Sequence, residues 1–198
     1  MDSRQSKASR PCGALLRRIH NTMNVLIRPA TEADIPAIAA IYAVEVRDFV
    51  NTYEYEVPDQ AEMLRRMRAV LDGGYPYIAA ELDGEVVGYA YASSFRSRAA
   101  YHWVVENSVY VAAGMQGRGI GAALLERLIA ECEARDFRQM IAVIGEPTNT
   151  ASIKLHERFG FHHVGTFPGI AWKQQRWLDT VFMQRALGSG NVAPPATP

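Results

Sequence analysis

The 198-residue chain has little cysteine, no excess charge of either sign and no long apolar run. Its two cysteines, Cys12 and Cys132, form no CxxC motif, a usage typical of a reducing cytoplasm. Lys and Arg total 21, as do Asp and Glu, whereas a dedicated nucleic-acid-binding protein normally carries a clear basic excess. No apolar segment reaches the length of a transmembrane helix, and the basic N-terminal region lacks the apolar core of a secretory signal. We therefore expect a soluble, cytoplasmic protein without a nucleic-acid or membrane partner.

Composition divides the chain into one domain and two ends. Residues 1–23 are basic and rich in small polar residues, so we expect a disordered extension in which Met23 is an alternative start. Residues 24–187 hold all the periodic segments, and an apolar content of 48% suffices for one core. Residues 188–198 contain Pro and Ala and are expected to form a flexible tail.

Hydrophobic periodicity predicts an α/β (α+β) succession of strands and helices. Strands are expected at 25–27, 77–82, 85–92, 102–111, 139–144, 161–164 and 177–185, and helices at 35–46, 59–71, 119–134 and 149–159. Asp83-Gly84 predicts a tight hairpin between the second and third strands. The strand–helix–strand order from 102 to 144 predicts a right-handed parallel crossover.

A glycine-rich turn follows the strand that ends at Val111. It reads Gln116-Gly117-Arg118-Gly119-Ile120-Gly121 and precedes an amphipathic helix, where backbone N–H groups free of side chains can hold a phosphate. No Gly-Lys-Ser/Thr follows, which argues against a nucleoside-triphosphate site. Gly117, Gly119 and Ala122 also fit a dinucleotide fingerprint, although residues 112–116 separate them from the strand, and a purely structural turn is a third interpretation.

Two segments carry a family resemblance. Gln116-x-x-Gly119-x-Gly121 after Val109-Tyr110-Val111 resembles the acyl-CoA signature of the GCN5-related N-acetyltransferases (GNAT), and Asn149-x-x-Ser152-x-x-Leu155-x-x-x-Phe159-Gly160-Phe161 resembles their downstream motif. Within that superfamily the chain resembles the phosphinothricin and methionine sulfoximine acetyltransferases over residues 25–187. The matching stretches are 27–30, 83–90, 105–111 and 142–144.

The resemblance implies a GNAT fold, in which helices flank a mixed central sheet of about seven strands and the central strands 102–111 and 139–144 splay apart. It also implies acetyl-CoA as co-substrate, no metal and a homodimer. Unpaired backbone on the splayed strands would bind pantetheine, and the glycine turn would bind the pyrophosphate. The expected co-substrate ligands are Val109, Tyr110, Val111, Gln116, Gly117, Arg118, Gly119, Ile120, Gly121, Ala122 and Asn149.

Acetyl transfer to an amine requires a base for the ammonium group and an acid for the departing thiolate. Glu106 is the candidate base, because partial burial on a strand raises the pKa of a carboxyl group and because it matches the catalytic glutamate of the resembling enzymes. The Val111 amide is the expected oxyanion donor. His156 is the candidate acid, since it stands where many superfamily members have a tyrosine, with a packing role as the alternative. No cysteine or serine is placed beside a base, which favours direct transfer.

The acceptor pocket is expected opposite the co-substrate, bordered by residues 49–55, 95–101 and 170–177. Arginine on the second segment would suit a carboxylate. The expected acceptor ligands are Phe49, Asn51, Arg96, Arg98, Trp103, Asn107 and Ser108. The sequence thus predicts an N-acetyltransferase for a small amino-acid-like amine of the phosphinothricin or methionine sulfoximine type. Acetylation of protein or peptide amines and a non-catalytic acyl-CoA sensor are the alternatives.

Overall fold

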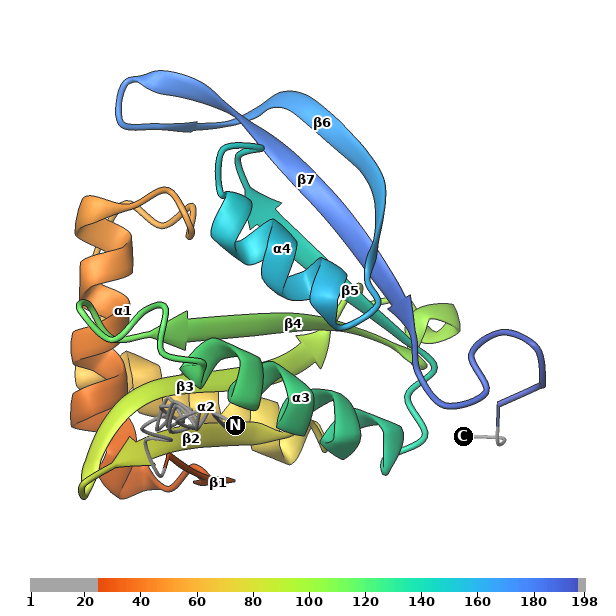
Figure 1. The fold of residues 1–198 in the computed structure, drawn as a ribbon, viewed down its shortest axis with the longest axis horizontal. Helices are drawn as coiled ribbons and strands as arrows, with labels where there is room; N and C mark the ends of the chain where they lie inside the picture. Colours follow the sequence, from red (N-terminus) through yellow and green to blue (C-terminus); the bar gives the residue numbers. More distant parts are fainter. Residues whose placement is uncertain (1–24, 196–198) are drawn as a thin grey trace, which may run out of the picture.

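Seven strands form one open sheet with helices on both faces (Figure 1) in a computed structural model that describes residues 25–195. The strand order is β1-β2-β3-β4-β5-β7-β6, and only β4 and β5 are parallel neighbours. The predicted extension at 1–23, with Cys12 and Met23, lies outside the described residues. The strands are β1 (Leu26–Pro29), β2 (Tyr77–Leu82), β3 (Glu85–Ser94), β4 (Val104–Val111), β5 (Gln139–Gly145), β6 (His162–Lys173) and β7 (Arg176–Ala186).

Four α-helices lie where the hydrophobic periodicity predicts them. They are α1 (Ile35–Asp48), α2 (Gln60–Asp72), α3 (Ile120–Glu133) and α4 (Thr150–Arg158). Short polar side chains begin two of them: Asp59 accepts from the Glu62 amide at 2.8 Å, and Asn149 from the Ser152 amide at 3.2 Å. Such caps satisfy N–H groups that have no partner inside the first turn of a helix.

Two apolar clusters hold the helices against opposite faces of the sheet. Leu124, Leu125 and Leu128 of α3 are fully buried against one face, while Ile38 of α1 and Met67 of α2 are buried on the other. Figure 1 shows α3 in front of the sheet and α2 behind it. The sheet is therefore the middle layer, and any passage through it connects two separate surfaces.

The central strands β4 and β5 separate part of the way along. Their parallel pairing ends at Asn107 and Ala142. Beyond that point β4 continues to Val111 paired only with β3, and β5 continues to Gly145 paired only with β7. The predicted splay of this pair is confirmed.

The β6–β7 hairpin is longer than the sequence predicts. Strand β6 runs to Lys173, beyond the predicted end at Val164. Pro168 and Gly169 are typical strand breakers, but shifts of register between Phe167 and Ala171 absorb them, so the pairing with β7 resumes. The hairpin consequently carries Lys173 back toward α1.

Among residues 25–195, no helix is both long enough and apolar enough to cross a membrane.

Candidate active site between the splayed strands

A cavity of about 670 Å³ lies where β4 and β5 separate. Its walls come from α1, the loop after α1, both splayed strands, the glycine turn and the start of α4. The sequence-predicted residues that line it are Phe49, Asn51, Glu106, Asn107, Ser108, Val109, Tyr110, Val111, Gln116, Gly121, Asn149 and His156. The structure thus brings together two sets of residues that the sequence assigns to different substrates.

Strand alternation places the cavity on both faces of the sheet. Tyr110 packs with α1 and α2, whereas Val109 and Val111 pack with α3. Because successive side chains point to opposite faces, Glu106 lies on the Tyr110 side and Asn107 on the Val109 side. The gap between the strands therefore joins the two faces.

Backbone groups along β4 also alternate in direction. Ala112 N–H bonds to Val87 of β3, and Trp103 C=O accepts from Gln139 at the start of β5. Even-numbered residues thus bond to β3 and odd-numbered residues face β5, which places the backbone N–H and C=O groups of Val109 and Val111 toward the gap. Gln116 Nε2 donates to the Val111 carbonyl oxygen at 3.3 Å, and a ligand with amide groups can pair with the remaining groups of this edge.

The glycine turn ends beside this edge. Gly117 and Gly119 have φ values of 75° and 85°, which other residues rarely adopt, and Gly119 is the N-cap of α3. The Ala123 amide donates to Gly119, so the amides of Ile120, Gly121 and Ala122 have no partner inside the helix and can face an anion. Gln116 and Gly121 line the cavity itself, whereas Gly117, Arg118, Gly119, Ile120 and Ala122 lie outside its wall.

Glu106 is the acidic group of the central strand. Its side chain is half-buried, and no other described residue makes a hydrogen bond or ion pair with its carboxylate. Burial raises the pKa of this carboxyl above its ordinary value. A carboxylate with these properties is suited to accept a proton from a ligand.

His156 lies on the opposite face and is almost fully buried. Its Nδ1 is 2.8 Å from the Ser152 carbonyl oxygen and its Nε2 is 3.1 Å from Asn107 Oδ1, while Asn107 Nδ2 donates to Ile141 O at 3.1 Å. The Ser152 hydroxyl oxygen also lies 3.4 Å from Nδ1. The carbonyl oxygen at Nδ1 and the amide oxygen at Nε2 are both satisfied when both ring nitrogens carry protons. Burial acts against the charge and lowers the pKa, and the Ser152 hydrogen bond partly opposes it.

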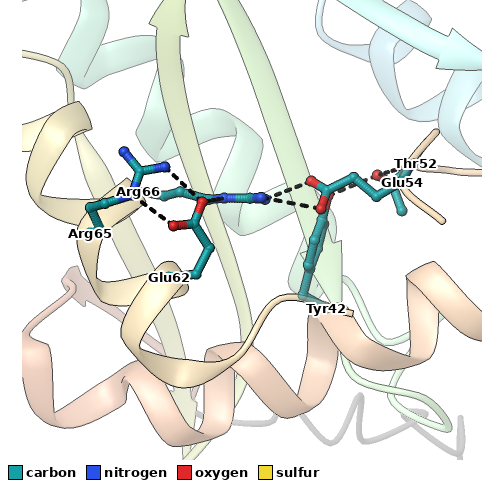
Figure 2. Close-up of polar contacts among 6 residues, drawn as sticks. All are labelled: Tyr42, Thr52, Glu54, Glu62, Arg65 and Arg66. Atoms are coloured by element: carbon teal, nitrogen blue, oxygen red, sulfur yellow. Dashed lines mark hydrogen bonds and ion pairs between the residues drawn. The ribbon is translucent and has the colours of Figure 1, made fainter. Parts of the chain in front are cut away.

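The loop at 49–55 forms the mouth of the cavity on the α1 side. Figure 2 shows the Glu54 carboxylate between the Tyr42 hydroxyl and the Arg66 guanidinium, with Thr52 beside the same hydroxyl. Tyr42 Oη lies 2.8 Å from both Thr52 Oγ1 and Glu54 Oε1, and Arg66 reaches Glu54 at 2.6 Å. In Figure 2, Glu62 lies between Arg65 and Arg66 and orients the second of them. These contacts hold the loop to α1 and α2.

Two charged residues of this region were missed from the sequence. Glu45 of α1 lines the cavity although it is only 7% exposed, and it accepts from Asn51 Nδ2 at 2.6 Å. Lys173 of β6 is 4% exposed and donates to the carbonyl oxygens of Phe49 and Thr52 at 2.8 and 2.6 Å. The apolar period of α1 signals that Glu45 lies near Ile41 and Tyr42, but no local signal brings Lys173 there.

Three predicted acceptor ligands lie away from the cavity wall. Arg96 is exposed, with its guanidinium 5.1 Å from the Phe95 ring centre, and Arg98 precedes a short 3₁₀ turn at Ala99–Tyr101. Trp103 packs edge-on against His102. No arginine or lysine lines the cavity among the described residues. Among those residues there is also no group of three or more His, Cys, Asp or Glu side chains placed to hold a metal ion.

Comparison with known proteins gives a consistent result. Residues 38–161 match the model of the acetyltransferase (GNAT) family. The chain is 46% identical over 169 residues to the phosphinothricin N-acetyltransferase of Alcaligenes faecalis, covering 85% of this chain and 86% of that protein. It is 38% identical to the L-methionine sulfoximine/L-methionine sulfone acetyltransferase of Pseudomonas paraeruginosa, covering 87% and 100%. The crystal structure of a GNAT superfamily phosphinothricin acetyltransferase from Sinorhizobium meliloti with AcCoA superposes with a TM-score of 0.85 at 45% identity, covering 88% of this chain and 94% of that one.

Proposed function

The chain belongs to the GNAT acetyltransferase family and is an acetyl-CoA-dependent N-acyltransferase, and on that premise we propose that it acetylates the amine of a small amino-acid-like substrate. Phosphinothricin and methionine sulfoximine, the substrates in the names of the relatives, represent the class. The observation that carries the proposal is the passage through the sheet, with the Glu106 carboxylate at one side and no hydrogen bond or ion pair to it from residues 25–195.

Acetyl-CoA binds on the α3 side of the passage in this proposal. The backbone edge of Val109 and Val111 beyond the β5 pairing supports a role in pairing with the pantetheine amides, and the backbone amides at the N-terminus of α3, from Gly119 to Ala122, support a role in binding the pyrophosphate. Asn149 borders the same cavity from the start of α4. The bound molecule supplies an acetyl thioester, whose reactive carbon belongs in the gap.

The amine approaches from the α1 side, where Glu106 removes a proton from the ammonium group, directly or through a water. The free amine nitrogen attacks the thioester carbon, and the Val111 amide stabilises the charge that develops on the carbonyl oxygen. The C–S bond then breaks and the nitrogen releases its second proton to solvent, so that the acetyl group passes to nitrogen and the sulfur leaves as a thiolate. No covalent enzyme intermediate is required.

His156 is proposed as the acid that protonates the sulfur. It lies on the co-substrate side of β4, opposite Glu106, so acid and base act on opposite sides of the gap. Burial is the larger effect and lowers the pKa of His156, while the two acceptors around its ring act in the opposite direction and favour the imidazolium form. Asn107 positions the Nε2 proton in this proposal.

The residues that line the cavity on the acceptor side suggest how the substrate is held. Phe49 and Tyr91 offer apolar surface, and Asn51 and Ser108 offer hydrogen-bonding groups. We assign the acceptor contacts to these residues and not to Arg96, Arg98 and Trp103, which lie outside the wall.

A cytoplasmic homodimer completes the proposal. The β6–β7 hairpin exposes Val164, Phe167, Ile170, Trp172 and Trp177, and several exposed apolar side chains on one hairpin suit contact with a second copy of the chain. Cys132 is a buried free thiol, which suits a reducing compartment. Light scattering of the wild type and of a Trp172→Ser/Trp177→Ser variant tests the dimer: a monomeric wild type contradicts it.

Thiol release from acetyl-CoA tests the function. Phosphinothricin, methionine sulfoximine, methionine and a short peptide with a free N-terminus serve as acceptors, with Glu106→Gln assayed alongside. We expect turnover with the first two and a large loss in the variant. Turnover only with the peptide favours the alternative of peptide acetylation. Tight CoA binding without turnover of any amine favours a sensor, and unchanged turnover in Glu106→Gln excludes Glu106 as the base.

A further inference from the structure

A chain of three side chains crosses the mouth of the cavity. Glu45 lies on α1, Asn51 on the loop at 49–55 and Asn149 at the start of α4. Asn51 Nδ2 donates to Glu45 Oε2 at 2.6 Å, and Asn149 Nδ2 donates to Asn51 Oδ1 at 3.0 Å. Residues 98 positions apart in sequence are thus joined across the gap between the two halves of the sheet.

The direction of the hydrogen bonds among these three side chains is set at Asn149. The Ser152 N–H can only donate, so Asn149 must offer its carbonyl oxygen there, at 3.2 Å. Its amide nitrogen then faces Asn51, which must present an oxygen and direct its own nitrogen at Glu45. Glu45 must accept, as an ionised carboxylate does. Every orientation is therefore set by one backbone amide of α4.

The loop that carries Asn51 is held in place independently. Lys173 donates to the carbonyl oxygens of Phe49 and Thr52 on either side of it. The Val50 carbonyl oxygen rests against Gly145 at the end of β5, where a Cβ would overlap it. Asn51 is thus presented at one place, between α1 and α4.

We propose that Asn51 is a positioning residue that couples the acceptor side of the site to acetyl-CoA binding, by bridging Glu45 of α1 to Asn149 of α4. The inference rests on the proposed function for the identity of the two substrates. When the hydrogen bonds from Glu45 through Asn51 to Asn149 are intact, the loop at 49–55 and the N-terminus of α4 form one wall that both substrates contact. Glu45, which is joined to Asn149 through Asn51, then influences affinity for CoA.

The experiment measures CoA binding by calorimetry and acetyl-transfer kinetics in four variants. Glu45→Ala ends the chain without an acceptor, so we expect CoA affinity to fall about threefold to tenfold, as for loss of one hydrogen bond. Glu45→Gln keeps a carbonyl oxygen that accepts from Asn51 and serves as the matched control, with affinity near that of the wild type. Glu45→Ala should also raise KM for acetyl-CoA, with a smaller effect on kcat, whereas Glu45→Gln should leave both parameters near those of the wild type.

The decisive pair reverses the chain. Asn149→Asp keeps a good N-cap for α4 but cannot donate to Asn51, so CoA affinity should fall. Adding Glu45→Gln lets glutamine donate to Asn51 Oδ1 while Asn51 Nδ2 donates to Asp, and affinity should return toward the wild type. Urea unfolding of each variant verifies the fold.

Two results would overturn the coupling: unchanged CoA affinity in Glu45→Ala, or no recovery in the double variant when Glu45→Gln alone is neutral. Failure of the proposed function is a separate result. In that case the wild type binds CoA but acetylates no amine, and the effect of the chain on CoA affinity can still be read.

Discussion

Asn107 Oδ1 lies 3.1 Å from His156 Nε2 on the face of β4 opposite to Glu106. The contact joins a strand to a helix 49 residues later in the sequence and is almost fully buried. Neighbouring residues of a single strand, Glu106 and Asn107, therefore serve the two faces of the site. The titration of His156 on one face and of Glu106 on the other can therefore be tested separately.

Removal of Asn107 should shift the titration of His156. In Asn107→Ala the Nε2 proton loses its acceptor, which destabilises imidazolium and lowers the pKa further below its ordinary value. The alkaline limb of the kcat profile, where the acid loses its proton, should move to lower pH. Ser152→Ala is the comparison variant: it removes the Oγ that lies 3.4 Å from Nδ1 but keeps the backbone carbonyl that accepts from Nδ1, so it should move the limb less than Asn107→Ala does. An unmoved limb in Asn107→Ala would remove His156 from the acid role.

Glu106 should determine the acidic limb of the profile of kcat/KM against pH. Burial raises the pKa of this carboxyl, and the base works only when ionised, so kcat/KM should fall as pH drops through a value above that of an ordinary glutamate. Glu106→Gln should reduce kcat/KM by roughly 10²- to 10⁴-fold. Calorimetry should show CoA affinity close to that of the wild type, because Glu106 faces the other side of the sheet. A variant that retains the same acidic limb would show that another group titrates there.

The packing of the loop against β5 should be sensitive to one methyl group. In Gly145→Ala the new Cβ meets the Val50 carbonyl oxygen, so the loop must move. We expect a loss of about 1–3 kcal/mol in unfolding free energy, as for an overpacked site, and a higher KM for the acceptor amine. Gly165→Ala on β6 is the matched control, because a Cβ there meets nothing within 4 Å. Equal stability and KM in the two variants would argue against a close loop contact.

Asp34 should make the free energy of unfolding depend on pH in the acidic range. Arg28 donates to both of its oxygens at 2.8 Å, and the Thr31 amide donates at 2.7 Å. These donors, Arg28 first, lower the pKa of the carboxyl. The resulting stability is present above the unfolded pKa of about 3.9 and is lost as pH falls through the lower folded value.

Asp34→Asn should therefore cost about 1–3 kcal/mol of unfolding free energy at pH 7, and the difference from the wild type should shrink near pH 2.5. Urea denaturation at both pH values measures it. The exposed Asp48→Asn change provides the comparison and should show little difference at either pH. A penalty for Asp34→Asn that is the same at both pH values would contradict the assignment.

Local signals account for what the sequence predicted well. Asp83-Gly84 adopts positive φ values of 52° and 85° in the hairpin, and the turn glycines precede α3 as expected. Glu106 and Asn149 occupy the cavity because a strand and a cap determine their places within a few residues. The splay of β4 and β5 was implied by the family resemblance that these motifs carry.

Long-range pairing accounts for what the sequence missed. Lys173 reaches the loop carbonyls 121 and 124 residues away only because β6 is continued past its breakers by β7. Glu45 is buried although charged residues are usually exposed, and its partner is on a loop without periodicity. Arg96 and Arg98 carry the charge that would suit a substrate carboxylate. Their positions on a loop depend on tertiary packing, however, and both residues lie outside the cavity wall.

The separation of β4 and β5 also bears on the order of events in turnover. Because the passage is lined from both faces, the proposed placement of the two substrates gives the two products separate routes of departure. Neither CoA nor the acetylated amine then needs to wait for the other, and each competes only with the substrate that enters by its own side. Steady-state patterns should accordingly be those of a ternary complex with random release, and not those of a ping-pong cycle.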